Sequence, residues 1–130
     1  MISREMSEAF AKLGAEVYIC GRRGEVLQQT ADEIMAAHGG VVRPIACDIR
    51  SAEAVREMVE QIWSTGGALT GLMNNAAGNF ISRTEDLSPR GFDAIANIVF
   101  RGSFYVTQEI GKRWIAEKKK GSVCSIVTTW

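Results

Sequence analysis

The chain has 130 residues, and its 15 basic and 15 acidic side chains leave no formal net charge. Apolar residues make up 46% and charged residues 23%, which is the balance of one modest globular domain. A neutral chain offers no electrostatic footprint for nucleic acid or an anionic membrane. No apolar run reaches the length of a membrane span, and residues 1–5 do not resemble a signal peptide.

The cysteines favour a reducing compartment. Cys20, Cys47 and Cys124 are far apart, odd in number and embedded in apolar runs. This pattern predicts buried thiols in the cytoplasm, with neither disulfides nor a metal site. The lone His38 precedes two glycines at an expected helix end, where a solvated terminus is favoured over a ligand or a base.

The first half of the chain alternates between helical and strand-like periodicity. Residues 3–13 predict a helix, and residues 16–20 form a short β-rich run. A second helix is expected over residues 25–37 and a second strand over residues 41–47. Within that strand, Pro44 indicates an edge position, because proline cannot donate to a sheet ladder.

The second half continues the alternation. Ser51 can cap a helix over residues 52–63, and residues 69–73 form a short apolar strand. A β-branched run over residues 122–129 is the last expected strand. Alternation of this kind predicts a Rossmann-like, doubly wound α/β fold, with a parallel sheet between helices.

A long helix is expected between those last two strands. Ser88 followed by Pro89 is a strong start signal, and helical periodicity then runs to Lys118. Gly102 and Gly111 weaken the helix propensity, so we expect them to permit close packing or a partner helix.

Three motifs follow expected strands, where parallel α/β sheets bind ligands. The first is Arg22-Arg23, directly after the strand at 16–20. Arginine at this point accommodates the 2′-phosphate of NADP, whereas an acidic residue would bind the ribose hydroxyl of NAD. A pair of solvated arginines in a surface turn is the alternative. The position after a strand favours the phosphate site.

The second motif is Asp48, after the strand at 41–47, whose carboxylate could accept a hydrogen bond from adenine. Taken alone, it is better explained as an acid at a helix entrance. The third is the run at 74–80, Asn-Asn-Ala-Ala-Gly-Asn-Phe. Its small residues let backbone approach a flat ligand closely, and a polar turn is the alternative.

The run at 74–78 resembles the Asn-Asn-Ala-Gly signature of the short-chain dehydrogenases/reductases. Its additional alanine, the extension through Ser82 and the later Leu87-Ser88-Pro89 are similar to the 2,4-dienoyl-CoA reductase branch. The similarity covers essentially all 130 residues in order, so the resemblance implies one partial NAD(P)-binding Rossmann domain over residues 1–130.

The resemblance implies roles for individual residues. NADP(H) would be the cofactor, with Arg22 and Arg23 at the 2′-phosphate and Asp48 at the adenine. Residues Ile2, Asn75, Ala76, Ala77 and Gly78 complete the cofactor-binding positions. Asn79 matches a catalytic asparagine that polarises the substrate, and Arg50, Phe80 and Ser88 match positions that contact a fatty acyl-CoA. The implied reaction is hydride transfer to a 2,4-dienoyl-CoA in fatty-acid β-oxidation, which requires donors for the developing charge and a proton source.

The sequence also departs from the family pattern. It opens after the first strand and glycine-rich loop, and it stops at Trp130, where the family places a proton-donating tyrosine, before the family's lysine. Arg101 stands where the superfamily usually has asparagine. We therefore expect an incomplete sheet, in which the strands at 16–20 and 41–47 are separated from the other two. The 130 residues alone are expected to have little or no turnover.

Two other functions remain open. The substrate could be an enoyl or 3-oxoacyl thioester, although Asn79 and Phe80 argue against a general ketoacyl reductase. The chain could also be a non-catalytic nucleotide-binding or association module. A homo-oligomer through the helix at 88–118 fits either function. Along that helix, the apolar side chains at an interface or in the core would be Phe92, Ile95, Val99 and Phe104.

Overall fold

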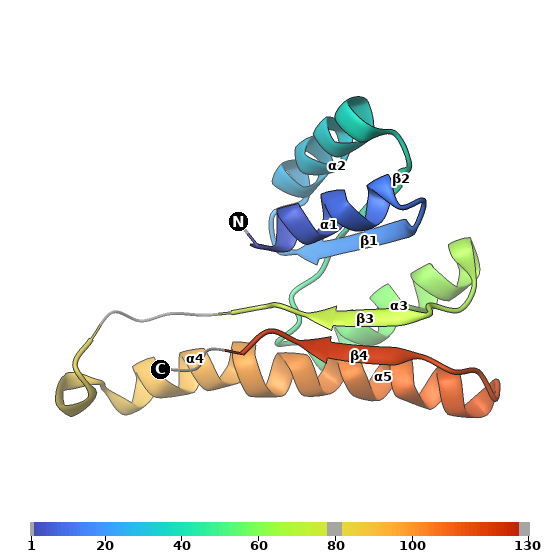
Figure 1. The fold of residues 1–130 in the computed structure, drawn as a ribbon. Helices are drawn as coiled ribbons and strands as arrows, with labels where there is room; N and C mark the ends of the chain where they lie inside the picture. Colours follow the sequence, from blue (N-terminus) through green and yellow to red (C-terminus); the bar gives the residue numbers. More distant parts are fainter. Residues whose placement is uncertain (1, 78–81, 128–130) are drawn as a thin grey trace. The chain divides into compact units, whose positions relative to one another are not determined.

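The computed structural model describes residues 2–77 and 82–127 (Figure 1). They divide into two compact units, residues 1–48 and residues 49–130, and each is described by itself. Among the described residues, no helix combines the length and apolar character needed to cross a lipid bilayer.

The first unit contains two helices and a two-stranded sheet. Its elements are α1 (Ile2–Lys12), β1 (Glu16–Gly21), α2 (Gly24–His38) and β2 (Val41–Ala46). The strands pair in parallel, and the two helices pack on each other and on the strands (Figure 1). The buried core is formed by Ala11, Ala31, Ile34 and Val42. Helix α2 ends at Gly39, whose φ of 71° suits glycine.

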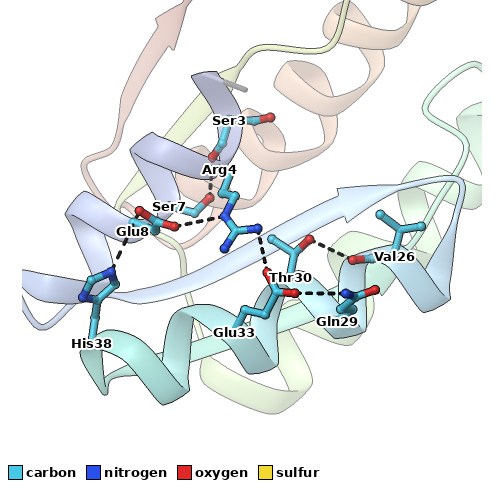
Figure 2. A network of polar contacts seen from close by, with 9 residues as sticks. All are labelled: Ser3, Arg4, Ser7, Glu8, Val26, Gln29, Thr30, Glu33 and His38. Carbon is cyan, nitrogen blue, oxygen red and sulfur yellow. Dashed lines mark hydrogen bonds and ion pairs between the residues drawn. The ribbon is translucent and has the colours of Figure 1, made fainter.

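A polar network joins α1 to α2 on the surface of this unit (Figure 2). Arg4 donates to Glu8 at 3.0 Å and pairs with Glu33 at 2.7 Å. The hydrogen bond from Arg4 lowers the pKa of Glu8. His38, the last residue of α2, lies 3.9 Å from Glu8. It is therefore a surface residue at a helix end, as the sequence predicted.

The second unit contains a parallel two-stranded sheet and a long helical run. Its elements are α3 (Ala52–Gly66), β3 (Gly71–Asn74), η1 (Thr84–Asp86), α4 (Pro89–Ala96), η2 (Asn97–Gly102), α5 (Ser103–Ala116) and β4 (Ser122–Ser125). Strand β3 pairs with β4, and the elements α4, η2 and α5 form one continuous run (Figure 1). Helix α3 extends past its expected end and stops at Gly67, where φ is 80°.

Helices α3 and α5 form the core of the second unit. Their buried side chains are Val55, Met58, Val59 and Ile62 on α3 and Val106, Ile110 and Trp114 on α5. At the rim, Trp63 donates its indole N–H to Glu117 at 2.7 Å, and the guanidinium of Arg113 lies 5.4 Å from the Trp63 ring centroid. Trp114 donates to the carbonyl of Leu69 at 2.7 Å, which ties α5 to the start of β3.

The predicted α/β order is confirmed, and so is the separation of the strands into two pairs, since β1 pairs with β2 and β3 with β4. Pro44 lies in β2, which pairs only with β1 in the described part of the chain. Ser51 caps α3 by accepting a hydrogen bond from the Ala54 amide at 3.2 Å. That the 130 residues form one partial domain stays a prediction.

Two expectations, one about cysteine burial and one about helix geometry, are wrong. Cys20 and Cys124 are exposed, and only Cys47 is buried, because each two-stranded sheet leaves much of its surface uncovered. Of the two alternatives for the long helix, Phe92 and Phe104 fit an interface and not the core of the described chain, because they are 56% and 57% exposed. The predicted uniform helix contains a π-helical turn, η2, which periodicity does not reveal.

Candidate functional site

The first unit places its candidate site residues at the carboxyl edge of the β1–β2 sheet. Strand β1 ends at Gly21, and Arg22 and Arg23 follow; Arg23 precedes the first residue of α2. The amide of Cys47 donates to the carbonyl of Gly21 at 2.8 Å, which extends the pairing beyond Ala46. Asp48 therefore emerges from the same edge as the two arginines.

The charge at this edge fits an anionic group. Both arginines are exposed, and neither forms an ion pair with another described residue. The amino-terminal end of α2 adds partial positive charge, and Glu25 in its first turn opposes it. Two guanidinium groups beside a helix start suit a phosphate monoester, because guanidinium binds phosphate oxygens in a bidentate manner. The residues present thus fit the 2′-phosphate of NADP.

The second unit anchors the residues that follow β3. Asn74, the last residue of β3, donates its amide Nδ2 to Thr107 Oγ1 on α5 at 3.0 Å. Its carbonyl accepts from the amide of Ile126 at 2.9 Å, so the chain is held from both sides. Asn75, Ala76 and Ala77 then leave the strand, with Asn75 half-buried and the alanines exposed. Gly78, Asn79 and Phe80 lie outside the described residues.

Two candidate substrate residues lie at the ends of helices in this unit. Ser88 caps α4, and its Oγ accepts a hydrogen bond from the Gly91 amide at 3.1 Å. The Ser88 hydroxyl, which accepts a hydrogen bond in this cap, can also donate one. Arg50 is exposed in the turn before α3, and the preceding Ile49 packs against Gly102.

Arg101 and Ile2 both lie in helical segments. Arg101 Nη1 donates to Asn97 Oδ1 at 3.0 Å, one turn earlier in η2. This bond orients the guanidinium along its own helix. Ile2 begins α1. In the parts of the chain that the structure describes, no group of His, Cys, Asp and Glu side chains is suited to hold a metal ion.

Two structural roles near the candidate site have no local signature in the sequence. Asn74 was part of the polar run, but its bond to Thr107 joins positions far apart in the chain and has no local signature. Ile49 lies between the candidate site residues Asp48 and Arg50 in the sequence. Its packing against Gly102 on the long helix has no signal in the sequence. The expectation that Gly102 permits close packing is confirmed, whereas an added Cβ at Gly111 would meet nothing within 4 Å in the described chain.

The chain is similar to known proteins in both sequence and fold. The family model described as short chain dehydrogenase matches residues 2–129. The chain is 43% identical over 130 residues to a probable 2,4-dienoyl-CoA reductase 3, described as (3E)-enoyl-CoA-producing, from Caenorhabditis elegans. The match covers 99% of this chain and 42% of that reductase, so the chain spans less than half the length of this curated relative.

Two solved structures share the fold. A short chain dehydrogenase from Bacillus anthracis superposes with a TM-score of 0.92 at 40% identity, covering 98% of this chain and 53% of that one. A metagenomic short-chain oxidoreductase in complex with NADP superposes with a TM-score of 0.89 at 25% identity, covering 99% of this chain and 58% of that one.

Proposed function

The chain belongs to the short-chain dehydrogenase family, and on this premise we propose that it is part of an NADP(H)-dependent reductase of 2,4-dienoyl-CoA thioesters. The observation that carries the proposal is the position of Arg22 and Arg23 directly after the carboxyl end of β1. No acidic residue stands at this strand end. The name of the worm relative supports the substrate class, and the NADP complex of the metagenomic neighbour supports the cofactor.

On the cofactor side, each residue has a defined task. Arg22 and Arg23 bind the 2′-phosphate, and Asp48 accepts from the adenine amino group. Asn75, Ala76, Ala77 and Gly78 allow close approach to the dinucleotide, because three of them have small side chains or none. Ile2 contributes at the phosphates. When bound, NADPH supplies the hydride.

On the substrate side, the chain must hold a thioester and stabilise the charge that develops on its oxygen. Asn79 is proposed to donate a hydrogen bond to that oxygen, where a fixed donor is worth more than in water. Arg50 and Phe80 contact the acyl-CoA, and the Ser88 hydroxyl donates to it while its oxygen remains bonded to Gly91. The product enters fatty-acid β-oxidation. Among the described residues, Cys20, Cys47 and Cys124 form no disulfide, which is consistent with a cytoplasmic location.

The cofactor assignment is tested by nucleotide titration, with tryptophan fluorescence as the readout. The polypeptide containing this chain should bind NADPH more tightly than NADH. Arg22→Glu should reduce or reverse that preference by about 10- to 100-fold, since one charge-assisted phosphate contact is lost and a repulsive charge is introduced. Arg56→Glu on α3 is the control, because it makes the same charge change at a residue that has no proposed contact with the cofactor. Equal affinity for both nucleotides in the unaltered protein would refute the assignment.

The substrate assignment is tested by comparing turnover of 2,4-dienoyl-CoA, 2-enoyl-CoA and 3-oxoacyl-CoA with NADPH. We expect the dienoyl thioester to have the highest kcat/KM. A higher value for either of the other thioesters would move the enzyme to a different reaction. Saturable NADPH binding without any turnover would favour a nucleotide-binding module.

We also propose that the protein self-associates through the helical run of α4, η2 and α5. Phe92, Phe100 and Phe104 are 56%, 70% and 57% exposed along this run. Large exposed aromatic side chains are enriched at protein interfaces. Light scattering should therefore report an oligomer, and Phe100→Glu should shift it to a smaller species. A monomer at micromolar concentration would contradict the proposal.

A further inference from the structure

Gly102, the last residue of η2, lies directly against the side chain of Ile49. A Cβ added at Gly102 would stand 2.5 Å from Ile49 Cδ1 and 2.6 Å from Ile49 Cγ1. Nonbonded carbon atoms attract at roughly 3.5–4.0 Å and repel strongly at shorter separations. The Ile49 side chain therefore occupies the volume that any side chain at position 102 would need.

The contact reaches the base of the Ile49 side chain. The added atom would also lie 3.3 Å from Ile49 Cβ, which moves only with the backbone. Isoleucine is β-branched and restricted about χ1, so rotation of its terminal atoms gives limited relief. Gly102 is buried within a continuous helical run, whereas Ile49 and Arg50 form a turn. The turn is the part that would have to shift.

Arg50 directly follows Ile49 and is exposed at the start of the segment that leads into α3. We propose that Gly102 is a positioning residue for substrate binding. Because Gly102 has no side chain, Ile49 can pack directly against it, and the packed Ile49 fixes the turn that orients Arg50 toward the acyl-CoA. The inference rests on the proposed function, in which Arg50 contacts this substrate. The π-helical turn supports it, since such turns occur frequently at functional sites.

The test uses Gly102→Ala in the polypeptide containing this chain, with 2,4-hexadienoyl-CoA as the probe. The KM and the dissociation constant for the thioester should rise about tenfold, the factor expected for one misaligned charge-assisted hydrogen bond. The kcat should change by less than about twofold, and the KM for NADPH should change less than the KM for the thioester, because Arg22 and Arg23 follow β1 and only Asp48 adjoins the turn. A purely structural defect would affect both ligands.

A double variant tests whether Ile49 is the residue that the added methyl group displaces. In Gly102→Ala/Ile49→Ala, the residue at 49 no longer carries the two atoms nearest the new methyl group, so thermal stability and thioester affinity should return toward their original values. Ile49→Ala alone should fold and weaken thioester binding, because the turn loses the atoms that pack against Gly102, whereas in the double variant the methyl group added at position 102 replaces part of that contact. This variant keeps the test decisive if Gly102→Ala does not fold. Gly111→Ala on α5 is the matched control, since its Cβ would meet no described atom within 4 Å.

The outcomes separate the two proposals. If the unaltered protein neither binds nor reduces hexadienoyl-CoA, the proposed function is wrong. If it does both, and Gly102→Ala binds the thioester equally well, Gly102 has no positioning role. Failure of the double variant to recover affinity and stability would also overturn the inference, because it would show that Ile49 is not what the methyl group displaces.

Discussion

Gly121 offers a direct measure of how tightly the second unit is packed. A Cβ at this position would lie 2.3 Å from Cε2 and Cζ2 of Trp114 and 2.5 Å from Cδ2. These are ring atoms, so no change of a flexible side chain relieves the overlap. Gly121→Ala must therefore displace either the indole or the chain that precedes β4.

Neither displacement is free of cost. The indole is 7% exposed and donates to the Leu69 carbonyl at 2.7 Å. The chain near Gly121 is held because the Lys119 amide donates to the Trp114 carbonyl at 2.9 Å and the Ser122 amide donates to the Thr70 carbonyl at 3.0 Å. Overpacking costs about 1–3 kcal/mol, and a lost hydrogen bond adds about 1 kcal/mol. We expect a total loss of about 3 kcal/mol in the free energy of unfolding.

The assay is urea unfolding of the polypeptide containing this chain, followed by circular dichroism at 222 nm. Ellipticity is preferable to fluorescence because Trp114 is itself perturbed. Gly111→Ala is the control and should gain about 0.5–1 kcal/mol, since alanine is the better helix former and has room there. A loss below about 0.5 kcal/mol for Gly121→Ala would refute the reasoning, because that is the range of an uncrowded surface substitution.

Three further predictions test local features of the fold. Asn74→Ala should lower the free energy of unfolding by about 1 kcal/mol, because the hydrogen bond to Thr107 is removed, and Thr107→Val should lower it by about the same amount. The double variant should lose no more than either single variant, and full additivity of the two losses would contradict the bond. Ser51→Ala should cost about 1 kcal/mol through loss of the α3 cap, while Ser51→Asp should retain stability; equal losses would refute the capping role. The bond from Arg4 lowers the folded-state pKa of Glu8 below its ordinary 4.5. The stabilisation of the folded state by the Arg4–Glu8 bond is therefore present above that pH and is lost as pH falls through the lowered pKa. Arg4→Gln should flatten the acid side of a plot of Tm against pH. An unchanged plot would contradict this.

The order of helices and strands could be predicted from the sequence because its signals are local. The cap at Ser51 and the start signal at Ser88 each depend on residues within one helical turn. The π-helical turn at 97–102 could not be predicted, since it depends on what packs against the helix. Gly102 and Gly111 illustrate the difference: both weaken the helix equally in the sequence, yet only Gly102 faces a neighbouring side chain within the described chain.

In the candidate site, too, local features could be predicted from the sequence and long-range contacts could not. The side chains that follow strands β1, β2 and β3 were predicted because ligands bind at the carboxyl ends of parallel strands. The contacts behind them were not, because they join distant positions: Asn74 to Thr107, and Ile49 to Gly102.

Both of those partners lie on the single helical run of η2 and α5. Within the second unit, this run therefore supports the segment after β3 through Asn74 and the turn at Arg50 through Ile49. The helix that we propose as an association surface is thus also proposed to support the candidate site. Substitutions on its exposed aromatic side chains should alter assembly, whereas substitutions at Gly102 or Thr107 should alter the site. The two sets of variants can be separated experimentally, because no residue belongs to both.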